Sequence, residues 1–104
     1  MHYITALYDL PPDPAAFRSH YESVHIKLAA KLPGLRSMHH SFDIRPLGEG
    51  PAYFCLWTGI FDDAAAADAA LASPEGQALA ADIPNYVTAG MQLFRYATGE
   101  VLHD

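Results

Sequence analysis

The sequence predicts a small α+β domain in the order strand, helix, strand, strand, helix, strand. Residues 3–8, 35–45, 52–61 and 91–101 are rich in β-branched and aromatic side chains or alternate as strands do. Two other stretches carry helix caps and helical spacing. The length of 104 residues fits one domain, so residues 1–104 are assigned to a single domain. These elements predict one four-stranded antiparallel sheet with two helices on one face.

The first helix is bounded by clear signals. Asp13 can accept unpaired N–H groups as an N-cap, and Pro14 suits the first helical position. The helix ends at Leu32, because the residue before a proline avoids the helical region. At 100° per residue, one mainly apolar face collects six side chains: Phe17, Tyr21, Val24, His25, Leu28 and Leu32.

The second helical stretch is alanine-rich and has two starts. Asp62-Asp63 offers a cap for a helix through Leu71, and Ser73-Pro74 offers a fresh cap for a restart. The stretch ends at Ile83-Pro84, and the last strand is expected to run from residue 91 to Val101.

Apolar side chains occur on both alternation sets of the last three strands, so both faces of the sheet should need cover. One set holds Met38, Phe42, Phe54, Leu56, Ile60, Phe94 and Tyr96, and the other holds Tyr53, Trp57, Phe61, Met91 and Leu93. Helices can cover only one face. We therefore expect a homodimer that packs sheet against sheet.

Composition excludes several classes of partner. The net charge is −6 and the six basic residues are scattered, which disfavours binding to nucleic acid or to an anionic membrane. Cys55 is the single cysteine, and a buried strand position makes it a small hydrophobe. No signal-peptide pattern or membrane-spanning run occurs, so a cytoplasmic location is expected.

His25 is the first candidate for chemistry. It follows Tyr21 by one turn on the apolar face, so the two side chains can touch. Histidine titrates near neutrality and can act as acid or base. The alternative is a packed core histidine that donates to a backbone carbonyl.

Other candidates are weaker. His39 and His40 are adjacent on a strand and point to opposite faces, so they cannot chelate one ion together. No histidine spacing fits a zinc site, and no phosphate-binding or nucleotide-binding motif is present, so neither a metal nor a cofactor is expected. Trp57 and Tyr86 could line an aromatic pocket or simply pack in the core.

Two runs resemble the EthD family. The first places Phe17, Tyr21, His25, Leu28 and Lys31 at matching spacing before Leu32-Pro33-Gly34-Leu35. The second combines Ser73-Pro74-Glu75-Gly76-Gln77 with Ala81-Asp82-Ile83-Pro84-Asn85-Tyr86. The resemblance covers nearly the whole chain, and Lys27 departs from the proline that many members carry.

The resemblance implies a dimeric α+β barrel of two ferredoxin-like protomers, with a cleft between the first helix and the sheet. It directs His25 into that cleft, and it associates the family with alkyl-ether degradation and with oxidoreductases. The expected pocket holds Phe17, Leu28, His39, His40, Trp57 and Tyr86.

Two functions stay open on this basis. One is a cofactor-free oxidoreductase or isomerase that acts on small apolar ethers, lactones or aromatics, with His25 as acid or base. Tyr21 would orient the substrate or donate to a developing oxyanion, and His39 or His40 would assist. The other is a non-catalytic accessory protein that binds a hydrophobic metabolite for a partner oxygenase.

Overall fold

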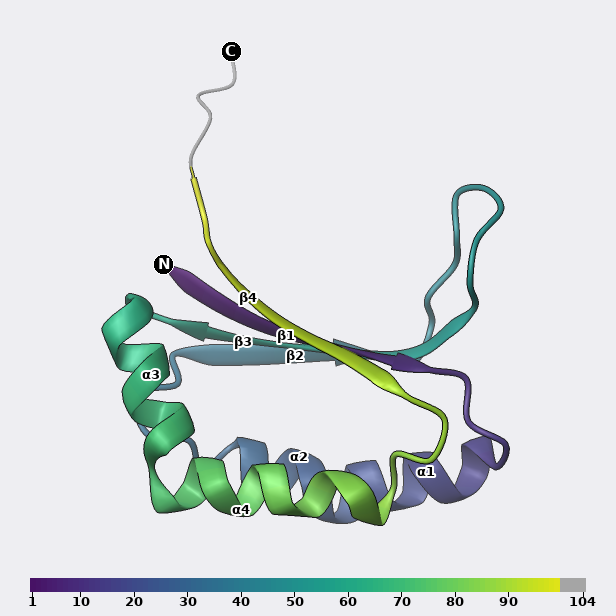
Figure 1. The fold of residues 1–104 in the computed structure, drawn as a ribbon, viewed down its shortest axis with the longest axis horizontal. Coiled ribbons are helices and arrows are strands. Elements are labelled where there is room, and N and C mark those ends of the chain that lie inside the picture. Colours follow the sequence, from purple (N-terminus) through teal and green to yellow (C-terminus); the bar gives the residue numbers. More distant parts are fainter. Residues whose placement is uncertain (100–104) are drawn as a thin grey trace.

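The computed structural model describes residues 1–99. These residues contain one four-stranded antiparallel sheet (Figure 1). Its strands are β1 (His2–Asp9), β2 (Ser37–Ser41), β3 (Tyr53–Phe61) and β4 (Met91–Ala97), in the spatial order β2-β3-β1-β4. The predicted α+β sheet is confirmed. Strand β2 is shorter than the predicted 35–45, and Val101, the expected end of the last strand, lies outside the described residues.

The helices cover one face of this sheet. The first helical region comprises α1 (Pro14–His20), a π-helical segment η1 (Tyr21–His25) and α2 (Ile26–Ala29), and it lies alongside α4 (Pro74–Asp82) (Figure 1). Helix α3 (Ala64–Ala72) leads from β3 into α4, and a 3-10 turn η2 (Ile83–Asn85) follows α4. One regular first helix was expected, but the wider π turn interrupts it.

Side-chain caps set the helix starts, as predicted. Asp13 accepts a hydrogen bond from the backbone N–H of Ala16 at 3.1 Å. Asp63 does the same for Ala66 at 2.8 Å, and Ser73 does so for Gly76 at 3.0 Å. Ser73 has extended backbone angles, so it separates α3 from α4 and turns the chain between them.

Replacing Ser73 by alanine should lower the free energy of unfolding by about 1 kcal/mol, the usual worth of a serine N-cap. The hydroxyl accepts from Gly76 and also donates to the carbonyl of Ala70, and alanine loses both bonds. A urea denaturation midpoint identical to that of the wild type would show that neither bond contributes to stability.

The hydrophobic core lies between the sheet and the helices. Tyr8, Trp57 and Phe61 are buried on the helix-facing side. Met38 and Phe42 also face the helices, although they were expected on the opposite face from Trp57. The Trp57 indole N–H donates to the Met38 sulfur at 3.4 Å, and the Phe42 ring packs edge-on against Tyr21. Strand β2 therefore enters the sheet in the opposite alternation from the one expected.

The opposite face of the sheet has no helix over it in the described part of the chain (Figure 1). The Thr5 and Thr58 hydroxyls hydrogen-bond across its centre at 3.1 Å. Strand alternation places several apolar side chains around that pair: Leu7, Leu56, Ile60, Phe94 and Tyr96. Within residues 1–99, no helix is long and apolar enough to cross a membrane.

Candidate functional site

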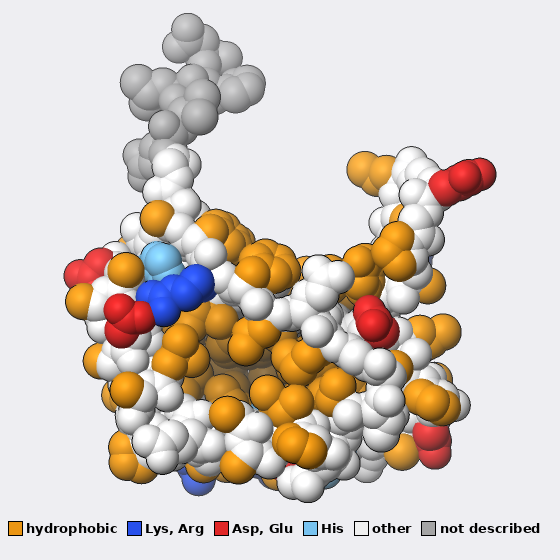
Figure 2. Space-filling model, in the orientation of Figure 1, with side chains coloured by type: hydrophobic (Ala, Val, Ile, Leu, Met, Phe, Trp, Pro, Cys, Tyr) orange, Lys and Arg blue, Asp and Glu red, His pale blue; other side chains and the backbone are white. Residues whose placement is uncertain are grey.

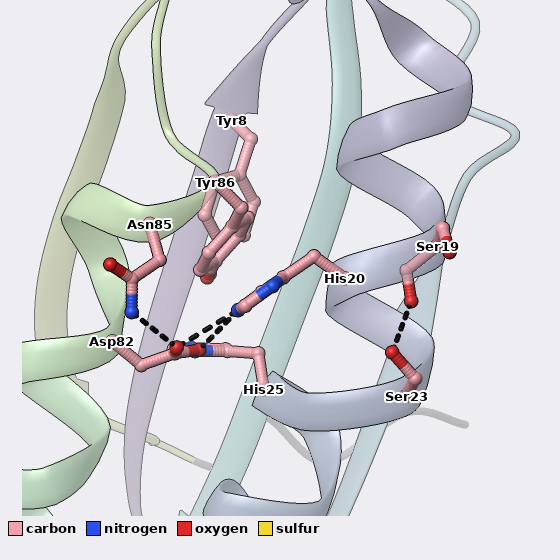
Figure 3. A network of polar contacts seen from close by, with 8 residues as sticks. All are labelled: Tyr8, Ser19, His20, Ser23, His25, Asp82, Asn85 and Tyr86. Atoms are coloured by element: carbon pink, nitrogen blue, oxygen red, sulfur yellow. Dashed lines mark hydrogen bonds and ion pairs between the residues drawn. The ribbon is translucent and has the colours of Figure 1, made fainter.

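The carboxylate of Asp82, at the end of α4, joins three polar side chains (Figure 3). Oδ2 lies 2.9 Å from Nδ1 of His25, and Oδ1 lies 2.9 Å from Nε2 of His20. The amide of Asn85 donates to Oδ1 at 3.0 Å. We refer to His20, His25, Asp82 and Asn85 as the Asp82 cluster.

The π-helical segment explains how both histidines reach one carboxylate. His20 and His25 are five residues apart, which in a regular α-helix places side chains about 140° apart around the axis. In a π turn the N–H of residue i+5 bonds to the carbonyl of residue i, and the N–H of Ile26 makes this bond to Tyr21. Residues five apart thus come to the same side of the helix.

Burial and hydrogen bonding set the charges in the cluster. Burial lowers the pKa of His25, and the hydrogen bond and negative charge of Asp82 oppose that effect only in part. Burial alone would raise the pKa of Asp82, but the bonds from Asn85, His20 and His25 hold it below its usual range. At neutral pH the cluster therefore holds an ionised Asp82 and a neutral His25.

The tautomer of His25 follows from this contact. An ionised carboxylate is only an acceptor, so the Nδ1 that faces it must carry the proton. Nε2 then keeps its lone pair and is the nitrogen that can accept a proton.

Acidification should weaken the fold through His25. Because the pKa of His25 is lower in the folded chain than in the unfolded chain, unfolding takes up a proton as the pH falls below about 6.5, and stability drops. Urea denaturation between pH 7.5 and pH 5 should show this loss, and His25→Gln should reduce its slope. An equal slope in the variant would contradict the assignment.

Two tyrosines, Tyr86 and Tyr8, lie next to the cluster. The Tyr86 ring stacks on His20 with centroids 5.4 Å apart and lies 4.6 Å from the His25 ring. Its hydroxyl shares a 2.8 Å hydrogen bond with that of Tyr8. Burial raises the pKa of Tyr8 to about 12 and that of Tyr86 further, so both stay neutral.

His25 also lines a cavity of about 80 Å³ between the sheet and the helices. Figure 2 shows the apolar hollow on the side where β4 faces α4. Its walls are mostly aliphatic and aromatic, and they include Ile4, Ala6, Tyr8, Trp57, Leu79, Ile83, Met91 and Leu93. His25 thus lies at the wall of an apolar chamber that opens to the surface.

The structure places some expected site residues at the cavity and others elsewhere. His25 and Trp57 line it, and Tyr86 packs behind the histidines. Tyr21 is fully buried in an aromatic cluster with Phe17, beside the Cys55 thiol. Among the described residues its hydroxyl has no hydrogen-bond partner.

The remaining expected pocket residues lie away from the cavity. Leu28 lies in a groove between α2 and the start of α4. His39 is exposed on the uncovered face of the sheet, opposite Thr58, and His40 is exposed at the edge of Tyr21. The cavity is lined from β1, β3 and β4, and β2 lies at the sheet edge opposite β4 and adds no residue to its wall.

Sequence reasoning missed His20, Asp82 and Asn85 as site residues. One signal was available: Asp82 ends a helix, where a carboxylate opposes the helix dipole unless another group compensates for it. Within the described residues, no group of three or more histidine, cysteine or acidic side chains could hold a metal ion.

Comparison with known proteins decides the family. A sequence model described as the EthD domain matches residues 11–90, a stretch that contains the whole Asp82 cluster. The chain belongs to the EthD family. This EthD family member is 36% identical, over 93 residues, to an uncharacterized 11.0 kDa protein of the thcB-thcC intergenic region of Rhodococcus erythropolis. That alignment covers 89% of this chain and 90% of the relative.

Solved structures agree with the EthD assignment and the fold. An EthD family protein from Bacillus halodurans, whose name refers to ethyl tert-butyl ether, has a TM-score of 0.85 and 29% identity, with 95% of this chain and 99% of that chain covered. A dimeric ferredoxin-like protein of unknown function from Bacteroides fragilis has a TM-score of 0.66 and 15% identity, with 93% and 95% covered. At that identity, the second similarity shows the fold alone.

Proposed function

We propose that this chain is an enzyme that acts on a small apolar metabolite, with His25 as general acid or base and without a metal or organic cofactor. One observation carries the proposal: His25 lines an apolar cavity while its Nδ1 is held by buried Asp82 at 2.9 Å. A base oriented by a carboxylate is a recurring arrangement in acid–base catalysis. A purely packed histidine has no need of a cavity beside it.

Each group of the dyad has a distinct role. Asp82 holds the ring and fixes the tautomer, so that Nε2 is the free acceptor. The lowered pKa of His25 keeps it neutral near pH 7, ready to take a proton from the substrate. The imidazolium that forms is then stabilised by the Asp82 carboxylate, and the same proton can return to the product.

The cavity limits the substrate class. A void of about 150 Å³ holds benzene, so the 80 Å³ here admits only the reacting part of a substrate in this conformation. The walls are apolar, and Nε2 of neutral His25 is an acceptor, which fits a phenolic O–H or the acidic C–H beside a lactone carbonyl. An ether oxygen is itself an acceptor, so an ether would be held by the apolar walls alone. The name of the Bacillus halodurans relative refers to such an ether.

The apolar walls also support a second function. A non-catalytic accessory protein that holds a hydrophobic metabolite for a partner oxygenase would use the same cavity. It would not need the bond between Asp82 and His25, and this difference separates the two.

A ligand screen followed by a turnover assay tests the proposal. Small ethers, lactones and phenols should be ranked by the rise in melting temperature, because a ligand that binds the native state stabilises it by mass action. Hits are then incubated in D₂O and followed by NMR for product formation or deuterium incorporation. Conversion that depends on Asp82 supports the enzyme, whereas binding with no conversion or exchange supports the accessory protein.

We also propose that the chain forms a homodimer through the uncovered face of its sheet. That face carries Leu56, Phe94 and Tyr96, and the last two are 45% and 42% exposed. The ferredoxin-like relative from Bacteroides fragilis is described as dimeric. A stable interface of this kind buries about 2,000 Å² or more in total.

Sedimentation at micromolar concentration should therefore give the mass of a dimer, and Phe94→Glu should shift it to a monomer. Val24→Glu is the matched control, because Val24 is similarly exposed at 38% but lies on the helical side. A wild-type monomer at that concentration would rule out the dimer.

A further inference from the structure

The Asp82 cluster contains two histidines for one carboxylate. Nε2 of His20 lies 2.9 Å and 3.1 Å from the two oxygens of Asp82, and Nδ1 of His25 lies 2.9 Å from one of them. One carboxylate carries one negative charge, so it can neutralise one imidazolium and not two. Protonation of either ring must therefore disfavour protonation of the other.

The two rings differ in their access to water. The side chain of His20 is 28% exposed, and that of His25 is 7% exposed. A cation loses less hydration at the more exposed position. His20 can also approach both oxygens of the carboxylate, which spreads its charge over the whole group.

We propose that His20 is a positioning residue that carries the positive charge of the cluster and thereby adds to burial in keeping His25 neutral. This inference deepens the proposed function and rests on it for its catalytic meaning. When the pH falls, the cluster takes up its first proton on His20. His25 keeps its free Nε2 and can still accept a proton from the substrate.

Among residues 1–99, no other charged side chain competes for this role at the cluster. The titratable groups that pack around the two histidines are Tyr8, Tyr21 and Tyr86, and burial raises the pKa of each. Cys55, behind Tyr21, is likewise neutral because burial raises the pKa of its thiol to about 12. Arg18 and Glu22 pair with each other at 2.6 Å on the exposed side of the helix.

In the described part of the chain, the other elements around the two rings add no charge. Strand β2 contributes His40, which meets the edge of Tyr21 rather than either histidine of the cluster. The cavity side of His25 is lined by apolar side chains and by Tyr8. Within the described residues, Asp82 and His20 are therefore the charged neighbours of His25, and they act in addition to its burial.

NMR of the histidine rings tests the inference without any substrate. In ¹⁵N-labelled wild-type protein, ring ¹⁵N shifts followed from pH 8 to pH 4 should show His20 taking up a proton before His25. In His20→Gln, which can keep an N–H donor to Asp82 but has no charge, the titration midpoint of His25 should rise by about one pH unit. Lys27→Gln removes an exposed positive charge from the same helix and should shift it much less, because water screens that charge.

Two results would overturn the inference: protonation of His25 before His20 in the wild type, or an unchanged His25 midpoint in His20→Gln. The first uses the unaltered protein, so it decides the matter even if the variant does not fold. The proposed function fails separately, if His25 proves dispensable for turnover while the titrations behave as expected. With a substrate in hand, His20→Gln should move the acid limb of the pH profile of kcat/KM upward, a shift that a merely structural role would not produce.

Discussion

Glutamine in place of His25 should lower turnover of a bound substrate by about 100-fold or more, the usual worth of a positioned general acid or base. The amide of glutamine can still donate to Asp82, which otherwise would lose one of its buried partners. The variant should therefore keep its dimer and most of its stability. Turnover and urea denaturation measured on the same preparation test both parts.

The alternative role predicts a different pattern. If His25 is only a packed core residue, the change should destabilise the fold by about 1–3 kcal/mol through a misfitted polar group and leave turnover of bound ligand intact. Lys27→Gln provides a matched control, because it places the same side chain at an exposed position two residues along the helix. A His25→Gln protein that is destabilised and still turns over ligand would rule out the catalytic role.

Gly76→Ala should lower the free energy of unfolding by about 3 kcal/mol, the upper range for overpacking a close contact. A Cβ at this position would lie 2.3 Å from the Ala70 carbonyl oxygen and 2.6 Å from that of Leu71. Both are backbone atoms, so α3 and α4 would have to separate. Elsewhere in a helix the same exchange stabilises by about 1 kcal/mol, so the sign is diagnostic.

Gly48→Ala is the control for this measurement, since a Cβ there meets nothing within 4 Å. Urea midpoints for the two variants and the wild type should separate Gly76 from Gly48 clearly. A Gly76→Ala protein as stable as the wild type would mean that the two helices can move apart at little cost.

Local signals were enough to predict most of the fold. The caps at Asp13 and Ser73 act within three residues, and the structure forms both. The apolar stretch of β3 predicted its strand, and Pro33 and Pro84 predicted the ends of the two helical stretches, again from neighbouring residues alone. Strand ends were less predictable, because β2 is an edge strand and stops where its pairing with β3 stops.

The site was predictable only in part, for two physical reasons. His25 stood out on the apolar face of its helix, but Asp82 is 57 residues away in sequence and only tertiary packing brings it to the ring. His20 was not among the side chains collected on that face, because projection at 100° per residue assumes a regular α-helix. The π segment at Tyr21–His25 breaks that assumption where it matters most.

Because of the π segment, His20 and His25 meet through the rotation per residue of the helix between them, and not through their sequence spacing alone. The same two histidines, five positions apart on an ordinary helix, would point to divergent sides and could not share a carboxylate. Two chains can therefore agree at every residue of this cluster and still differ in chemistry, if only one of them has the widened turn. Backbone geometry, as well as residue identity, is what a comparison of such sites between family members has to match.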